Sequence, residues 1–80
     1  MRITFTKLGE CYETGASRTG KRGSKPAIGR GATVNPKTRV LVLTQGHGDK
    51  FHRSEETCAT YREAVRKAIS FIREIESKNL

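Results

Sequence analysis

The fold is decided at residues 60–75, which read TYREAVRKAISFIREI. Thr60 and Glu63 have the spacing of a capping box, in which the Thr hydroxyl accepts the backbone N–H of residue 63 and the Glu side chain reaches back. Apolar side chains then recur every three or four residues, as on one face of a helix: Tyr61, Val65, Ala68, Ile72 and Ile75. We therefore predict an amphipathic helix over residues 60–78, with Cys58 directed toward the same core.

Two segments that precede this helix have the pattern of strands. Residues 2–8 alternate, with Ile3 and Phe5 on one face and polar side chains on the other. Residues 39–45 form the densest β-branched run, and the Gly-His-Gly-Asp that follows is typical of a tight turn, which gives a hairpin over residues 39–53. The sequence therefore predicts an α+β fold, in which a small antiparallel sheet of about three strands packs against one long C-terminal helix.

The segment between the first strand and the hairpin is basic and rich in glycine. The chain carries 16 Lys and Arg against 8 Asp and Glu, a formal net charge of +8. Residues 14–39 hold seven of the basic side chains and no acidic one. We predict a flexible basic loop over residues 14–37, with a short strand near residues 32–35 as an open alternative, in a single domain of residues 1–80.

The composition excludes several classes of protein. The N-terminus has no apolar signal region, and no apolar run approaches the ~20 residues that span a bilayer. Two cysteines are too few for a disulfide scaffold, so a cytoplasmic protein without a membrane partner is expected. His47, Asp49 and His52 lack the spacing of a metal site. We expect no enzyme activity, cofactor, metal or small-molecule substrate.

The basic charge points to a polyanion as the partner. We expect a nucleic-acid-binding protein, with double-stranded DNA favoured over RNA. Few aromatic side chains are left over for base stacking, which favours a duplex or structured nucleic acid over single strands. The side chains expected to contact phosphates or a minor groove lie in or beside the basic loop: Arg18, Lys21, Arg22, Lys25, Arg30, Lys37 and Arg39. Those expected on or beside the uncovered face of the sheet are Arg2, Thr4, Arg39 and Arg53.

The order of elements in residues 39–75 resembles that of a known family. A hairpin with a basic return strand, Lys50-Phe51-His52-Arg53, precedes the helix that opens with Thr60-Tyr61-Arg62-Glu63-Ala64. This pattern resembles the arm-type DNA-binding domain of tyrosine recombinases (phage integrases). The resemblance implies a three-stranded sheet that enters the major groove, and an accessory role in a phage or mobile element. The long basic insertion, and the extra residues 54–57 before the cap, depart from that family's pattern.

Two alternatives remain open at the level of sequence. The basic segment could bind an acidic protein surface, as in a small inhibitor or accessory protein of a phage or mobile element that targets a nucleic-acid enzyme. RNA or ribosome binding is a further alternative. Arg62, Arg66 and Arg73 share one flank of the helix, and they form either a solvated rim or a second phosphate-binding surface.

Overall fold

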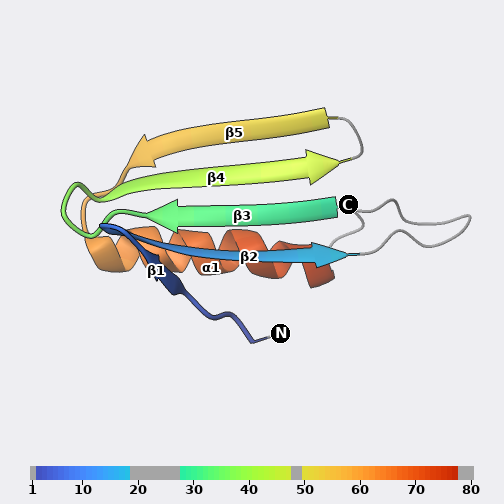
Figure 1. Cartoon of the computed structure of the whole chain (residues 1–80), viewed down its shortest axis with the longest axis horizontal. Coiled ribbons are helices and arrows are strands. Elements are labelled where there is room, and N and C mark those ends of the chain that lie inside the picture. The colour runs from blue at the N-terminus through green and yellow to red at the C-terminus, as the bar shows by residue number, and fades with distance from the viewer. Residues whose placement is uncertain (1, 19–27, 48–49, 78–80) are drawn as a thin grey trace, which may run out of the picture.

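The computed structural model describes residues 2–18, 28–47 and 50–77. Five strands make one antiparallel sheet, in which the strand order follows the order along the chain (Figure 1). The elements are β1 (Thr6–Leu8), β2 (Cys11–Arg18), β3 (Ile28–Val34), β4 (Val40–His47), β5 (Lys50–Thr57) and α1 (Tyr61–Ser77). The α+β class and the single C-terminal helix are confirmed, but the sheet has five strands rather than about three.

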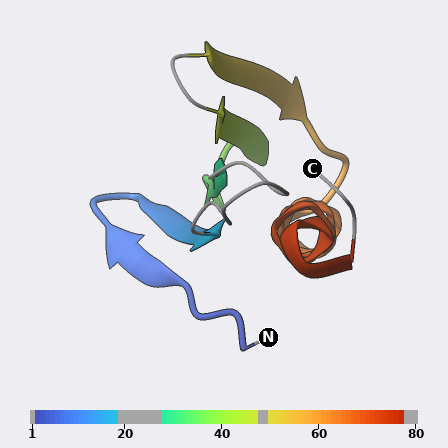
Figure 2. The ribbon, with the colours of Figure 1, turned by 90° about the vertical axis from the view of Figure 1, so that its right-hand side faces the viewer.

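Helix α1 covers one face of this sheet, where it packs mainly on β3 with β2 and β4 alongside. Seen along its axis, the helix lies against one side of the twisted sheet, and β5 extends beyond it (Figure 2). In β3 the burial alternates, because successive side chains of a strand point to opposite faces. Ile28, Ala32 and Val34 face the helix and are at most 3% exposed.

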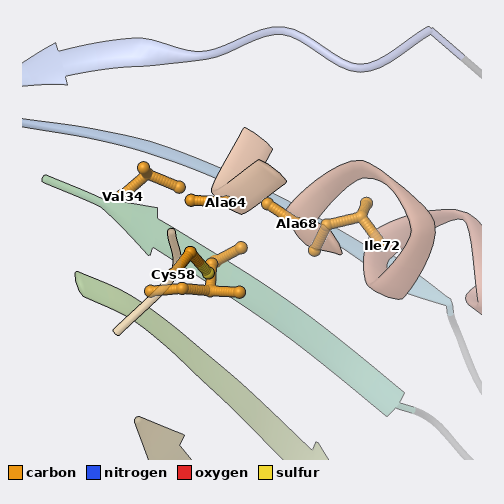
Figure 3. Close-up of a cluster of buried hydrophobic side chains, with 7 residues drawn as sticks. Val34, Cys58, Ala64, Ala68 and Ile72 are labelled. Carbon is orange, nitrogen blue, oxygen red and sulfur yellow. The ribbon is translucent and has the colours of Figure 1, made fainter. Parts of the chain in front are cut away.

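The core between helix and sheet combines small and branched side chains. Its buried members are Ala32, Val34, Leu41, Cys58, Ala64, Ala68 and Ile72. Figure 3 shows Ala64, Ala68 and Ile72 directed from the helix toward Val34 and Cys58. The two alanines let the helix backbone approach the sheet closely, while Ile72 fills the space farther along. The expectation that Cys58 joins this core is confirmed, since it is 4% exposed.

The capping box at the start of α1 is present. The Thr60 hydroxyl accepts the backbone N–H of Glu63 at 3.1 Å, and Glu63 Oε2 accepts the N–H of Ala59 at 2.8 Å. Two backbone donors that have no partner within the helix are thereby satisfied. The helix begins at Tyr61, directly after its cap, as the sequence predicts.

We expect Thr60→Ala to lower the free energy of unfolding by about 1 kcal/mol, because the N–H of Glu63 loses its acceptor. Urea unfolding followed by circular dichroism measures this change. Thr60→Asp keeps an acceptor oxygen at the cap and serves as the control, with stability close to that of the wild type. Equal losses in both variants would show that the cap does not depend on this hydrogen bond.

The prediction of a flexible loop over residues 14–37 is wrong for residues 14–18 and 28–34, which belong to β2 and β3, and the alternative of a short strand near residues 32–35 is confirmed in part by the end of β3. The two strands pair along their whole length, with Gly15 opposite Gly31. The glycines suggested a loop, yet at position 31 the sheet itself favours glycine. A Cβ built there would lie 2.7 Å from Thr44 Oγ1, on the neighbouring strand. Residues 19–27, the middle of the predicted loop, lie outside the described residues.

The predicted strand over residues 2–8 is shorter in the structure. Only Thr6–Leu8 pairs with β2, and residues 2–5 are not in a strand. Ile3 and Phe5 are nevertheless partly buried and pack against the core, so the apolar face was identified correctly. The predicted hairpin at 39–53 is present as β4 and β5, and it extends farther, to Thr57.

Candidate nucleic-acid interface

The side chains predicted to bind nucleic acid are divided between the two ends of the sheet. Arg18 ends β2 at the end where β3 begins and β4 gives way to β5 (Figure 1). Lys37 and Arg39 lie at the opposite end, in the connection between β3 and β4. Lys21, Arg22 and Lys25 fall outside the described residues. The predicted site is therefore not one continuous surface.

Arg30 is buried and does not belong to an external site. It lies on β3 beneath α1, and its side chain is 5% exposed. Its guanidinium carbon lies 4.3 Å from the centroid of the Phe71 ring, and Nη1 donates to the Phe71 carbonyl oxygen at 2.8 Å. Nη1 also lies 3.4 Å from Glu74 Oε1. The expectation that Arg30 contacts a phosphate is incompatible with this placement, because the side chain is enclosed by the helix.

Arg39 makes structural hydrogen bonds at the opposite end of the sheet. Its backbone adopts φ 62°, a left-handed conformation that is uncommon outside glycine. The Cys58 N–H donates to the Arg39 carbonyl at 2.9 Å, and Arg39 Nε donates to the Cys58 carbonyl at 3.3 Å. Arg39 thereby ties the β3–β4 connection to Cys58, two residues before the helix cap.

Three other predicted residues are exposed but scattered. Lys37 is 79% exposed in its side chain, and its Nζ lies 4.0 Å from Glu10 Oε1. Arg2 and Thr4 are exposed on the segment before β1 rather than on the sheet itself. Lys37 and Arg2 add positive charge to the surface, and Thr4 adds a neutral hydroxyl, without forming a cluster.

The face of the sheet away from α1, here called the open face, is not strongly basic. Among the predicted residues whose side chains are described in strands, Arg53 lies on the open face. Arg53 pairs with Thr44, and Thr44 pairs with Gly31, so the three residues share one face of the sheet. Arg53 Nη2 is 3.0 Å from Glu55 Oε2. Glu13 lies on the same face, opposite Thr33. The single described Arg on the open face is thus outnumbered by carboxylates.

The exposed side of α1 carries the clearest basic feature, the arginine strip formed by Arg62, Arg66 and Arg73. At about 100° per residue, these three positions fall within about 40° of one another around the helix axis. All three are exposed, and no hydrogen bond or ion pair holds them among the side chains that the structure describes. Glu74 borders the strip, but its carboxylate lies beside the buried Arg30.

Shallow hollows accompany the arginine strip along the helix. One is lined by Tyr61, Arg62, Val65 and Arg66, and the next by Arg66, Ile69, Ser70, Arg73 and Glu74. Sequence reasoning identified the flank but left its role open, because helical spacing alone does not distinguish a solvated rim from a ligand surface. The structure adds that these charges lack intramolecular partners within its described part.

Lys67 shows how a basic side chain on the same helix is neutralised. Its Nζ lies 2.9 Å from Glu56 Oε2 on β5 and 4.0 Å from Glu63 Oε1. The hydrogen bond to Glu56 raises the pKa of Lys67, so the ammonium remains charged at neutral pH. Lys67 therefore belongs to an intramolecular network of ion pairs rather than to the arginine strip.

Other kinds of site find little support in the described ranges. Within them, no three His, Cys, Asp or Glu side chains are grouped to hold a metal ion. Cys11 and Cys58 are free thiols. Burial, reinforced by the nearby Glu56 carboxylate, raises the pKa of the Cys58 thiol, which makes it a poor nucleophile at neutral pH. The one described helix, α1, is not of the length and apolar character that crossing a membrane requires.

Comparisons of the chain with protein-family models, with curated proteins and with solved structures find no match. The resemblance of residues 39–75 to the arm-type domain of tyrosine recombinases therefore stays a prediction.

Proposed function

We propose that this chain is a non-enzymatic nucleic-acid-binding protein whose preferred ligand is double-stranded DNA. The observation that carries the proposal is the arginine strip, in which Arg62, Arg66 and Arg73 are exposed on one side of α1 without intramolecular partners among the described side chains. Arginine without a carboxylate partner is a ready donor to phosphate oxygens. An overall charge of +8 adds a long-range attraction to a polyanion.

The dimensions of the arginine strip suit a duplex backbone. Arg62 and Arg73 are eleven residues apart, which is about 16 Å along a helix that rises 1.5 Å per residue. That length of B-DNA carries about ten phosphate charges. The strip also leads toward the end of the sheet where β2 stops at Arg18 (Figure 1). Lys21, Arg22 and Lys25 follow Arg18 in the sequence, and the proposal assigns phosphate contacts to these four basic residues as well as to the strip.

The aromatic side chains favour a duplex over a single strand as the ligand. The rings of Tyr12 and Tyr61 pack against each other at 6.4 Å, and Phe71 stacks on the Arg30 guanidinium. Phe5 packs against the core, and the 67% exposed Phe51 lies on the open face, opposite the arginine strip. The strip therefore offers phosphate contacts but no row of rings on which unpaired bases would stack.

The dependence of DNA affinity on salt tests this proposal. For about seven phosphate contacts, log K should fall against log salt with a slope of roughly −6, a loss of several thousand-fold between 50 and 200 mM salt. Replacing Arg62, Arg66 and Arg73 together by Ser should make the slope shallower by about 2.7. Fluorescence anisotropy with a labelled random-sequence duplex measures both quantities.

A matched variant separates the arginine strip from general charge. The triple variant Arg2→Ser, Lys7→Ser and Lys37→Ser removes the same three charges from exposed positions outside the strip, and it should leave the slope nearly unchanged. A quadruple variant of Arg18, Lys21, Arg22 and Lys25 to Ser should make the slope shallower by about 3.6. Equal slopes in the strip variant and its matched control would contradict the assignment, and absence of duplex binding at 50 mM salt would contradict the function.

A further inference from the structure

Strand β5 forms a long edge of the sheet that no other element covers within the described part of the chain. It hydrogen-bonds to β4 on one side, and it is the last strand in the sheet order. All eight of its residues are exposed, so neither face of the strand is buried. The opposite edge, β1, has only three residues. An eight-residue edge with unpaired N–H and C=O groups is a template for pairing with another strand.

The backbone of β5 presents alternate residues to this free edge. Just beyond the strand, the Cys58 N–H donates to the Arg39 carbonyl, in line with β4. Because donors alternate in direction along an antiparallel strand, the even-numbered residues of β5 bond to β4. The odd-numbered residues, Phe51, Arg53, Glu55 and Thr57, therefore direct their N–H and C=O groups outward.

The charges along β5 are complementary to those of the same strand reversed. Lys50 and Arg53 lie in its first half, and Glu55 and Glu56 lie in its second half. The strand is formally neutral, in a chain whose net charge is +8. An antiparallel copy brings the basic half of one strand against the acidic half of the other, which a polyanion or a generally acidic peptide cannot match.

We propose that β5 pairs with β5 of a second copy of this chain, in an antiparallel two-fold dimer with one continuous ten-stranded sheet. In the assigned register, the two Ser54 residues face each other across the two-fold axis. Arg53 then lies opposite the partner's Glu55 on each side of the axis. Opposite charges across an antiparallel pair stabilise it, and like charges destabilise it.

This register also allows the outward-directed backbone N–H and C=O groups of the two strands to hydrogen-bond to each other. It aligns outward-directed residues with outward-directed residues, so Phe51 pairs with the partner's Thr57 and every odd-numbered position of β5 has a partner. A shift by two residues would place Arg53 opposite the partner's Arg53 and would leave one end unpaired. On the helix side there is room for the second copy, because α1 lies over β2, β3 and β4.

The decisive experiment exchanges charges at two positions, with mass measured by sedimentation equilibrium at 150 mM salt. The wild type should form a species of about twice 8.9 kDa as concentration rises. The variants Arg53→Glu and Glu55→Arg each place like charges opposite each other, and each should weaken dimerisation at least about tenfold. An equimolar mixture of the two variants should dimerise again, and so should the double variant Arg53→Glu with Glu55→Arg.

Amide hydrogen exchange provides a second readout that does not depend on variants. The outward N–H groups of Phe51, Arg53 and Glu55 should become protected as protein concentration rises, while those of His52 and Ser54 should not change. A wild type that stays at 8.9 kDa at millimolar concentration overturns the proposal. A dimer that persists unchanged in both single variants overturns it too. DNA binding through the arginine strip is not required for either result, so this proposal and the proposed function fail separately.

Discussion

Replacement of Ile72 by Ala is expected to lower the free energy of unfolding by about 3–4 kcal/mol. Ile72 is fully buried between α1 and the sheet, and it is among the largest fully buried side chains in the described ranges. Its neighbours Ala64 and Ala68 are small and cannot expand into the space it would leave. An 80-residue domain has about 4–12 kcal/mol of stability in total, so this single change removes a large part of it.

Thermal unfolding followed by circular dichroism measures the effect. A loss of this size corresponds to a fall of roughly 15–25 °C in Tm for a domain of this length. Ser70→Ala, two residues away on the exposed side of the same helix, is the control and should change stability by less than about 0.5 kcal/mol. A small effect of Ile72→Ala would mean that α1 does not seal the core at this point.

Substitution of Arg30 is expected to destabilise the fold rather than to weaken DNA binding directly. Arg30→Ala removes the hydrogen bond to the Phe71 carbonyl, the stacking on the Phe71 ring and the packing of the aliphatic stem. We expect a loss of about 3 kcal/mol in the free energy of unfolding. Arg30 Nε is buried without a hydrogen-bond partner, which shows that the site is not ideally matched to a guanidinium.

Arg30→Met is the informative comparison. Methionine fills a similar volume and leaves no unsatisfied donor, so it should cost about 1 kcal/mol or less. Glu74, which loses its contact with Arg30 in both variants, is 34% exposed in its side chain and can be hydrated. The free energies of both variants are measured by urea unfolding. If Arg30→Ala behaves like Arg30→Met, the aliphatic stem does not contribute to packing as described.

The helix and its cap were predictable because their signals are local. Thr60 and Glu63 satisfy backbone donors within one turn, and the apolar spacing from Tyr61 to Ile75 does not depend on the rest of the fold. The β4–β5 hairpin was predictable for the same reason, since its β-branched run and its turn are adjacent in sequence. Only its length was underestimated, because the polar end of β5 carries no apolar alternation.

Strand β2 and most of β3 were missed because glycines and an arginine interrupt their apolar alternation, and only a short strand near residues 32–35 was considered. In β3, Ile28, Ala32 and Val34 occupy inward positions as expected of a strand, but Arg30 occupies the second of the four inward positions and is typical of a solvent-exposed site. Gly29 and Gly31 occupy the outward positions and read as loop. The signal that would have identified the strand is the alternation of larger residues with glycine over residues 28–31, in line with the apolar Ala32 and Val34. The ring of Phe71, 41 residues away, is what makes a buried arginine tolerable, and no local pattern reveals it.

The sequence predicted that the candidate site is basic, but it did not predict which basic residues form it. Positive charge is visible in composition, whereas its grouping depends on which carboxylates the fold brings near. Lys67 and the arginine strip lie on one helix, yet Lys67 meets Glu56 across the sheet edge while Arg62, Arg66 and Arg73 meet no carboxylate among the described side chains. That difference is produced by the position of β5 and cannot be read from helical spacing.

The strand order has a consequence for how the chain folds. Each strand pairs with the one made just before it, so every pairing closes a short loop and carries a small entropic cost. The sheet can therefore begin to assemble in sequence while the chain leaves the ribosome. Its apolar side, with Ile28, Ala32 and Val34, has no cover until α1, which follows all five strands, is synthesised. Cooperative folding must then wait for α1, and ribosome-bound chains that lack this helix would expose an apolar face of the sheet.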